Sequence, residues 1–211
     1  MEFIDIPTEQ TTAITDAILA LCVFAIAIYL YRSRHRRDQF KTNIWLGAFG
    51  LLTFASVIGV VAHGLKLPTT IYDALWQPIN LALGLTIAFF VMGVVYDLWG
   101  RAAAQRVRPL LIGAAIIFYI ITVLISGTFL VFILYEAVAM LFALGGYSWL
   151  AVRKQLAGAG SMAMGVLFTI VAAAVQASNG ISVTFIWQFD HNGLFHLIQV
   201  IGILFLAIGL V

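Results

Sequence analysis

The sequence predicts an all-α polytopic membrane protein, a bundle of seven transmembrane helices that forms a single domain over residues 1–211. Hydrophobic residues make up 63% of the chain, charged residues only 9%, and the mean hydropathy is +1.07. A soluble domain carries about 25% charged residues, so this chain cannot cover a water-facing surface. Soluble enzymes, disordered proteins and nucleic-acid-binding proteins are therefore excluded. A span with its connection takes ~30 residues, which gives about seven spans.

Seven apolar windows follow one another along the chain. We expect spans at residues 12–31, 43–65, 74–99, 108–127, 129–151, 160–178 and 192–211. The fourth and fifth spans are joined by the very short segment Ser126–Thr128. Pro78 is expected in the first turn or so of the third span, where a proline costs little. No base precedes Arg32, so we expect the first span to be a retained helix rather than a cleaved signal peptide.

The basic residues predict the orientation of the chain. Ten of the eleven Lys and Arg residues fall between spans one and two, three and four, or five and six, and only Lys66 falls on the other side. By the positive-inside rule, the N-terminus is outside and the C-terminus inside. The tryptophans agree, because all five lie near expected span ends, as an aromatic belt requires: Trp45, Trp76, Trp99, Trp149 and Trp187.

Ionisable residues gather at the predicted outer face. His63 ends the second span, and His191 and His196 open the seventh. The acidic residues at the same level are Glu9, Asp16, Asp73 and Asp190. Ionisable groups inside a membrane are costly and usually functional.

The seventh span begins with a dense polar segment. Asn192, His196 and Gln199 share one helical face, and Asp190 or Asn192 would suit the N-cap. His191 lies five residues before His196, about 140° away on an ideal helix. The two imidazoles converge only if His191 lies at the N-cap or in a distorted first turn.

Three histidines with carboxylates at one depth indicate a zinc site. His63, His191 and His196 would bind the metal, and Asp73 or Asp190 would orient a ligand or move protons. Glu9 and Asp16 would flank the site. Zinc lowers the pKa of a bound water towards ~7 and makes a nucleophile that attacks an ester or amide carbonyl. The alternative is that polar side chains at span ends only hydrogen-bond lipid headgroups or loops.

At these residues the chain resembles the CREST superfamily of seven-helix membrane hydrolases, which includes alkaline ceramidases and progestin/adiponectin-receptor proteins. The family pattern has a His near the end of helix two, an Asp near the start of helix three and an HxxxH pair opening helix seven. The matching positions are His63, Asp73, His191 and His196. The chain also resembles a bacterial family of uncharacterised seven-helix proteins through its segments PTEQTTAITD, AHGL and DHNGLFHLIQ.

The resemblance implies a zinc-dependent hydrolase of a lipid amide or ester in a bacterial inner membrane. Two features depart from the superfamily pattern. The histidine pair is spaced HxxxxH, and Gly59 stands where a serine usually precedes the helix-two His by four residues. Ser56, seven residues before His63, lies roughly on the same face two turns away.

Other interpretations compete with this hydrolase. A non-catalytic sensing or binding protein of the same fold would look similar, and His63 with His196 would also suit two axial haem ligands. Glu136, in the middle of the fifth span, is expected to make a buried hydrogen bond, with Asn80 or Gln176 as partners. The sequence leaves the substrate and the oligomeric state open.

Overall fold

The computed structural model describes residues 2–125, 129–178 and 180–211 of the chain. Its elements, in chain order, are α1 (Pro7–Ser33), the short 3-10 helix η1 (Arg34–Arg36), α2 (Gln39–Gly64), α3 (Thr69–Leu124), α4 (Phe129–Val152), α5 (Ala159–Ala177), β1 (Val183–Thr184), β2 (Gln188–Phe189) and α6 (His191–Leu210). The two strands pair antiparallel in a small hairpin. The predicted connection at Ser126–Thr128 lies outside the described residues.

Local chemistry explains where several helices begin. Pro7 is the first residue of α1, a position where its missing N–H has no helical partner to lose. Asp38 caps α2, because the backbone N–H of Lys41 donates to its Oδ1 at 2.8 Å. This hydrogen bond holds the pKa of the Asp38 carboxyl below its ordinary value. Asp190 caps α6 in the same way through the N–H of Gly193 at 2.9 Å.

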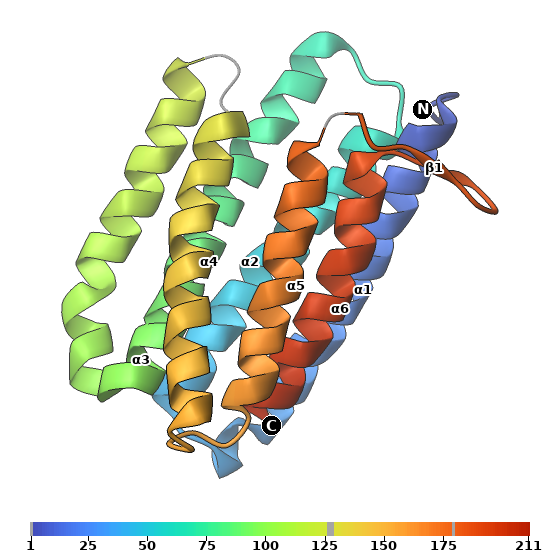
Figure 1. Cartoon of the computed structure of the whole chain (residues 1–211). Coiled ribbons are helices and arrows are strands. Elements are labelled where there is room, and N and C mark those ends of the chain that lie inside the picture. Colours follow the sequence, from blue (N-terminus) through green and yellow to red (C-terminus); the bar gives the residue numbers. More distant parts are fainter. Residues whose placement is uncertain (1, 126–128, 179) are drawn as a thin grey trace.

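Six of the described helices are long and apolar enough to cross a membrane, which confirms an all-α integral membrane protein. The longest, α3, has 56 residues and is interrupted at Gly100, where φ is +81° and ψ is −179°. Only glycine adopts this backbone region readily. The chain reverses there, so α3 consists of two arms that run side by side in opposite directions (Figure 1). The third expected span lies in the first arm, and residues 108–124 of the fourth lie in the second.

The prediction for Pro78 was wrong, because α3 begins at Thr69 and Pro78 therefore lies inside the helix, about two and a half turns from its start. Proline has no N–H to donate to the carbonyl four residues earlier. The carbonyl of Ala74 is consequently left without that helical hydrogen bond.

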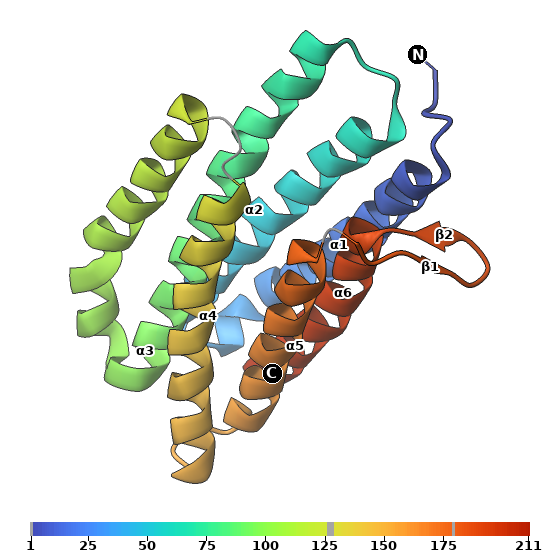
Figure 2. The same ribbon diagram turned by 45° about the horizontal axis from the view of Figure 1, so that its top comes forward.

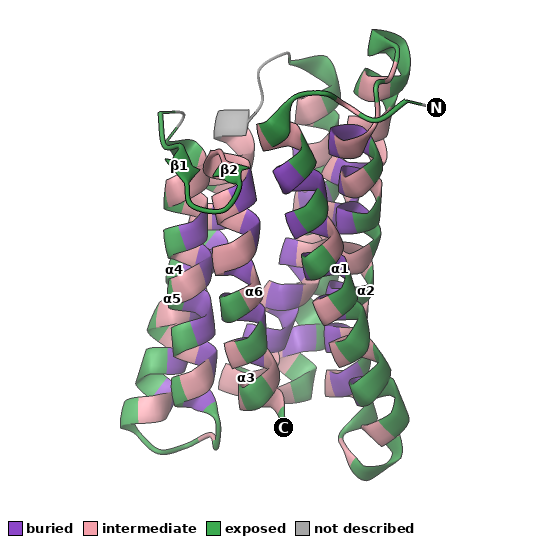
Figure 3. Ribbon diagram, turned by 90° about the vertical axis from the view of Figure 1, so that its right-hand side faces the viewer, coloured by how far each residue is buried: buried purple, intermediate pink, exposed green. Residues whose placement is uncertain are grey.

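The helices form a closed ring in which each one packs against the next in sequence and α6 packs against α1 (Figure 2). Buried faces turn towards the middle of the bundle and exposed faces lie on its outside (Figure 3). Trp45, Phe49, Tyr147 and Met162 belong to the main core. The outside carries exposed large apolar side chains, as expected of a surface in contact with lipid: Leu21, Leu110, Ile117, Val138 and Leu141 are examples.

The N-terminus and C-terminus lie at opposite ends of the bundle (Figure 1). We call the first of these the N-terminal end; it also carries the α2–α3 connection and the β1–β2 hairpin. Its leading segment is held by backbone pairing of Phe3 with Leu65 and by Lys66, whose Nζ contacts Asp5 Oδ2 at 2.5 Å. The hydrogen bond to Asp5 raises the pKa of Lys66 above its ordinary value.

Candidate functional site

A cavity of about 850 Å³ lies inside the ring and is lined by residues from all six α-helices. Its volume falls within the range of small-molecule sites, roughly 300–1,000 Å³. The side chains of Phe49, Phe90, Ile203 and Leu206 form part of an apolar section. Polar side chains from the N-terminal halves of α1 and α6 and the end of α2 form another section. The cavity therefore has both apolar and polar walls.

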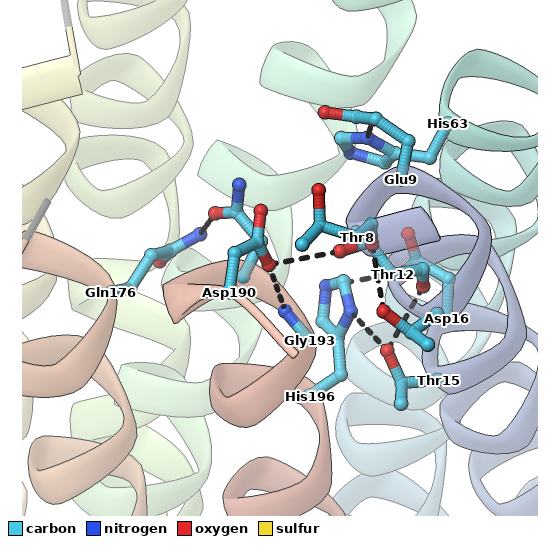
Figure 4. Close-up of polar contacts among 12 residues, drawn as sticks. Thr8, Glu9, Thr12, Thr15, Asp16, His63, Gln176, Asp190, Gly193 and His196 are labelled. Atoms are coloured by element: carbon cyan, nitrogen blue, oxygen red, sulfur yellow. Dashed lines mark hydrogen bonds and ion pairs between the residues drawn. The ribbon is translucent and has the colours of Figure 1, made fainter. Parts of the chain in front are cut away.

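The first polar contact joins α1 to the end of α2. Nδ1 of His63 lies 2.7 Å from Oε2 of Glu9 (Figure 4). Because the carboxylate accepts the Nδ1 hydrogen, Nε2 is the ring nitrogen without a hydrogen bond among the described residues. Trp76 packs edge-on against this ring, with the centroids 5.8 Å apart. The imidazole is thus oriented by a carboxylate and a neighbouring aromatic ring.

The second contact joins α1 to α6 and is more deeply buried. Nε2 of His196 lies 3.4 Å from Oδ1 of Asp16, and Nδ1 lies 3.1 Å from Oγ1 of Thr15 (Figure 4). The Thr15 hydroxyl donates its one hydrogen to the Thr12 carbonyl, so it accepts from Nδ1–H of His196. A neutral His196 then has its lone pair on Nε2, facing the carboxyl of Asp16. The contact therefore brings one imidazole nitrogen of α6 close to one carboxyl oxygen of α1.

Gly59 makes room for this pair. A Cβ at position 59 would lie 2.5 Å from Oδ2 and 2.9 Å from Cγ of Asp16. The carboxyl group of Asp16 thus fills the space that a side chain on α2 would need. A residue larger than glycine at position 59 would therefore clash with Asp16.

Asp190 positions α6 and the hairpin rather than lying free in the cavity. Its Oδ1 accepts from the N–H of Gly193 and, at 3.1 Å, from Oγ1 of Thr12. Thr11 binds the hairpin, because its hydroxyl lies 2.6 Å from the carbonyl oxygen of Gln188. Of the two residues predicted for the N-cap, Asp190 and Asn192, the structure has Asp190. Two threonines of α1 anchor the start of α6.

The remaining predicted site residues all line the cavity, in different settings. His191 is the first residue of α6 and half-buried, Asp73 is exposed, and Ser56 is buried. Asn192 accepts a hydrogen bond from Nε2 of Gln176 at 3.5 Å.

The predicted hydrogen bond between Gln176 and Glu136 was wrong, because Gln176 contacts Asn192 instead. Oε2 of Glu136 is buried without a hydrogen-bond partner among the described residues.

A zinc ion needs three protein ligands at an open catalytic site. Among residues 2–125, 129–178 and 180–211, no three His, Cys, Asp or Glu side chains converge closely enough to hold a metal ion. The structure instead pairs His63 with Glu9 and His196 with Asp16. The described arrangement does not fit the three-histidine set expected from the sequence.

A polar layer surrounds the cavity deeper in the bundle. Each α-helix contributes one polar side chain that lines the cavity and lies seven to nine residues from the helix terminus at the N-terminal end: Asp16, Ser56, Gln77, Glu136, Thr169 and Gln199. At the helical rise per residue this is ~10–14 Å along each helix. Gln77 and Thr169 were not predicted from the sequence. Helical spacing offered a signal for Gln199, which shares a face with His196, and for Ser56, which lies roughly on the face of His63.

The model of a family described as "Family of unknown function (DUF6962)" matches residues 11–211. No curated protein and no solved structure matches the chain. The matched region includes all residues of the polar layer. It also includes His63 and the pair of His196 with Asp16, but not Glu9, the partner of His63.

Proposed function

The chain belongs to this family of unknown function, DUF6962, and we propose that the protein binds an amphipathic, lipid-like small molecule inside its helix bundle. The observation that carries the proposal is the cavity of about 850 Å³ with apolar and polar walls. Buried polar groups without partners cost free energy in an apolar medium. A ligand with an apolar chain and a polar group would contact both kinds of wall.

The protein is also proposed to have a defined orientation in the membrane. The two arms of α3 and the other five long helices would make seven crossings. The bias of Lys and Arg places the N-terminus outside. The polar part of the cavity then lies nearer the outer leaflet of a bacterial cell membrane, from which the amphipathic ligand would enter.

Binding of radiolabelled dodecanol to purified protein in lipid nanodiscs tests this function. Leu52 lines the cavity, so Leu52→Trp is expected to fill part of it and to weaken binding. Leu21 is exposed on the outside of α1, so Leu21→Trp is the matched control and should bind like the wild type. Equal binding by the two variants would show that dodecanol occupies the lipid-facing surface and would refute the proposal.

A second candidate function is hydrolysis of a bound lipid amide or ester, which the two histidine–carboxylate pairs favour. Nε2 of His63 would take a proton from water as the oxygen attacks the carbonyl, while Glu9 holds the ring through Nδ1. The proton would then pass to the departing amine or alcohol. This step uses only residues that line the cavity.

Turnover of a panel of lipid amides and esters tests the second function. His63→Ala/His196→Ala should abolish turnover and leave the thermal unfolding of the bundle in place, and unchanged turnover would refute hydrolysis at this site. Zinc content of the two purified proteins tests whether a metal takes part. Equal zinc in both would refute a metal site at these histidines.

A further inference from the structure

We propose that the molecule bound in the cavity carries a protonated amine and that Glu136 binds its ammonium group. This inference rests on the proposed binding function and specifies the chemical class of its ligand. It depends on which polar atoms of the cavity lack a partner and on the charges that line it.

The unpartnered atoms of the polar layer are acceptors. Oε2 of Glu136, Oε1 of Gln199 and Oε1 of Gln77 are buried and have no hydrogen-bond partner among the described residues. All three residues line the cavity, and Glu136 and Gln199 are each 7% exposed. Their three oxygens need hydrogen-bond donors, which the described part of the chain does not supply.

The orientation of the Gln199 amide follows from its neighbour. The Thr169 hydroxyl donates its one hydrogen to the carbonyl of Gly165 at 3.1 Å. It must therefore accept from Nε2 of Gln199, which lies 3.2 Å away. This assignment leaves Oε1 of Gln199 as the acceptor in need of a donor.

Glu136 differs from the other carboxylates of the cavity. Glu9 contacts His63, Asp16 contacts His196, and Asp73 lies exposed. Glu136 is buried on α4 and has no ion-pair partner among the described residues. A carboxylate inside a membrane is costly unless it is paired or neutralised, so Glu136 is the position where a cationic ligand gains most.

The charged residues that line the cavity disfavour an anionic ligand. None of the described residues that line it is Lys or Arg. Lys41 is paired with Asp97 instead. The lining does include three histidines, but His63 and His196 already contact carboxylates. Burying an anionic headgroup beside these carboxylates would cost free energy.

One unpartnered donor also lines the cavity, but far from the polar layer. Nε1 of Trp45 is buried without a partner among the described residues. Trp45 lies eleven residues from Ser56 along α2, which corresponds to ~16 Å of helix. The polar layer itself therefore presents acceptors, and a primary ammonium offers three donor hydrogens and a charge that pairs with Glu136.

Competition against radiolabelled dodecanol by matched amphiphiles tests the inference, with the full chain in phosphatidylcholine nanodiscs. The competitors are dodecylamine, dodecanol and dodecanoate, which share one chain, and ethylammonium, which has the headgroup alone. We expect dodecylamine to bind about tenfold more tightly than dodecanol, because hydrogen bonds to charged groups are the stronger ones. Dodecanoate should bind most weakly, and ethylammonium should not compete.

Glu136→Gln should remove the tenfold preference for the amine, so that dodecylamine and dodecanol bind this variant with similar affinities. Glu136→Asp keeps the charge and should keep a preference for the amine. Glu2→Gln is the matched control, because Glu2 is exposed outside the cavity and this variant should behave like the wild type.

The outcomes separate this inference from the binding function beneath it. Equal affinities for the amine and the alcohol in the wild type, or an unchanged preference in a folded Glu136→Gln variant, would overturn the amine inference and leave the binding function standing. Failure of all three dodecyl compounds to bind, or competition by ethylammonium equal to that of dodecylamine, would overturn the amphipathic binding function itself. The series measured on the wild type decides the matter even if Glu136→Gln does not fold.

Discussion

Replacing Gly59 with alanine is expected to lower the free energy of unfolding by about 1–3 kcal/mol, the usual cost of overpacking a well-packed site. The added Cβ would lie 2.5 Å from Oδ2, 2.9 Å from Cγ and 3.1 Å from Oδ1 of Asp16. The shortest of these is about 1 Å closer than ordinary contact between heavy atoms. Asp16 is only 4% exposed and contacts His196, so its carboxyl group cannot withdraw without losing that contact.

Gly50 provides the matched control on the same helix. A Cβ there meets nothing within 4 Å, so Gly50→Ala reports the effect of helix propensity alone. In water that effect favours alanine by up to ~1 kcal/mol. Gly50→Ala is therefore expected to be neutral or slightly stabilising, and the difference between the two variants isolates the contact with Asp16.

Unfolding by dodecyl sulfate in mixed micelles, followed by tryptophan fluorescence, measures both variants and the same changes combined with Asp16→Ser. The shorter serine leaves room for the new Cβ, so the penalty of Gly59→Ala should largely disappear in that background. We expect a coupling free energy of about 0.5–3 kcal/mol, as found for residues in contact. The same stability for Gly59→Ala and Gly50→Ala, or an equal penalty in both backgrounds, would refute the view that Asp16 fills this space.

Three further predictions concern the ends and the reversal of the helices. Asp190→Ala should lower the free energy of unfolding by about 0.5–2 kcal/mol through loss of the α6 cap, whereas Asp190→Asn should retain most of it; equal losses would contradict the capping role. Gly100→Ala should cost about 1–3 kcal/mol, because φ is +81° there. Gly113→Ala in the second arm, where a Cβ meets nothing within 4 Å, is the control, and matching unfolding midpoints would argue against strain. The pKa of Asp38 is lowered in the folded state, so its contribution to stability is present above the ordinary pKa and lost as the pH falls through the lowered one. Thermal unfolding should therefore separate Asp38→Ala from the wild type near pH 7 and bring the two closer together at a pH below the lowered pKa, and a gap that widens in acid would contradict this sign.

The helices were predictable because the bilayer acts on each span separately. A segment inside lipid must satisfy its backbone hydrogen bonds internally, so a long apolar window becomes a helix whatever its neighbours are. The windows at 12–31, 43–65, 129–151, 160–178 and 192–211 correspond to α1, α2, α4, α5 and α6. The third window began five residues too late, and that error put Pro78 near a helix start rather than inside α3.

The reversal of the chain at Gly100 was harder to predict from the sequence. The expected spans at 74–99 and 108–127 left residues 100–107 between them as a connection. The structure keeps helix on both sides and reverses the chain at a single residue with left-handed φ. Glycine is common in membrane helices, so its presence alone does not distinguish a turn from a packing site.

The candidate site was predictable one helix at a time. Helical spacing placed Ser56 roughly on the face of His63 and Gln199 on the face of His196, and all four line the cavity. Spacing carries no information on which faces meet. The expected partners of Glu136 were therefore wrong, and Thr15, which holds the ring of His196, was missed although it adjoins Asp16.

The sequence by itself determined that this is a helical membrane protein, where most of its long helices run, and that Asp190 or Asn192 caps the last of them. Each of these properties depends on transfer from water or on hydrogen bonds between residues near one another in the chain. Only the tertiary structure decided that Asp16 packs into the space at Gly59, that each buried histidine faces a carboxylate, and that Glu136 lacks a partner among the described residues. Contacts between helices in lipid depend on close packing of small residues rather than on a hydrophobic driving force, so they depend on all six helices at once.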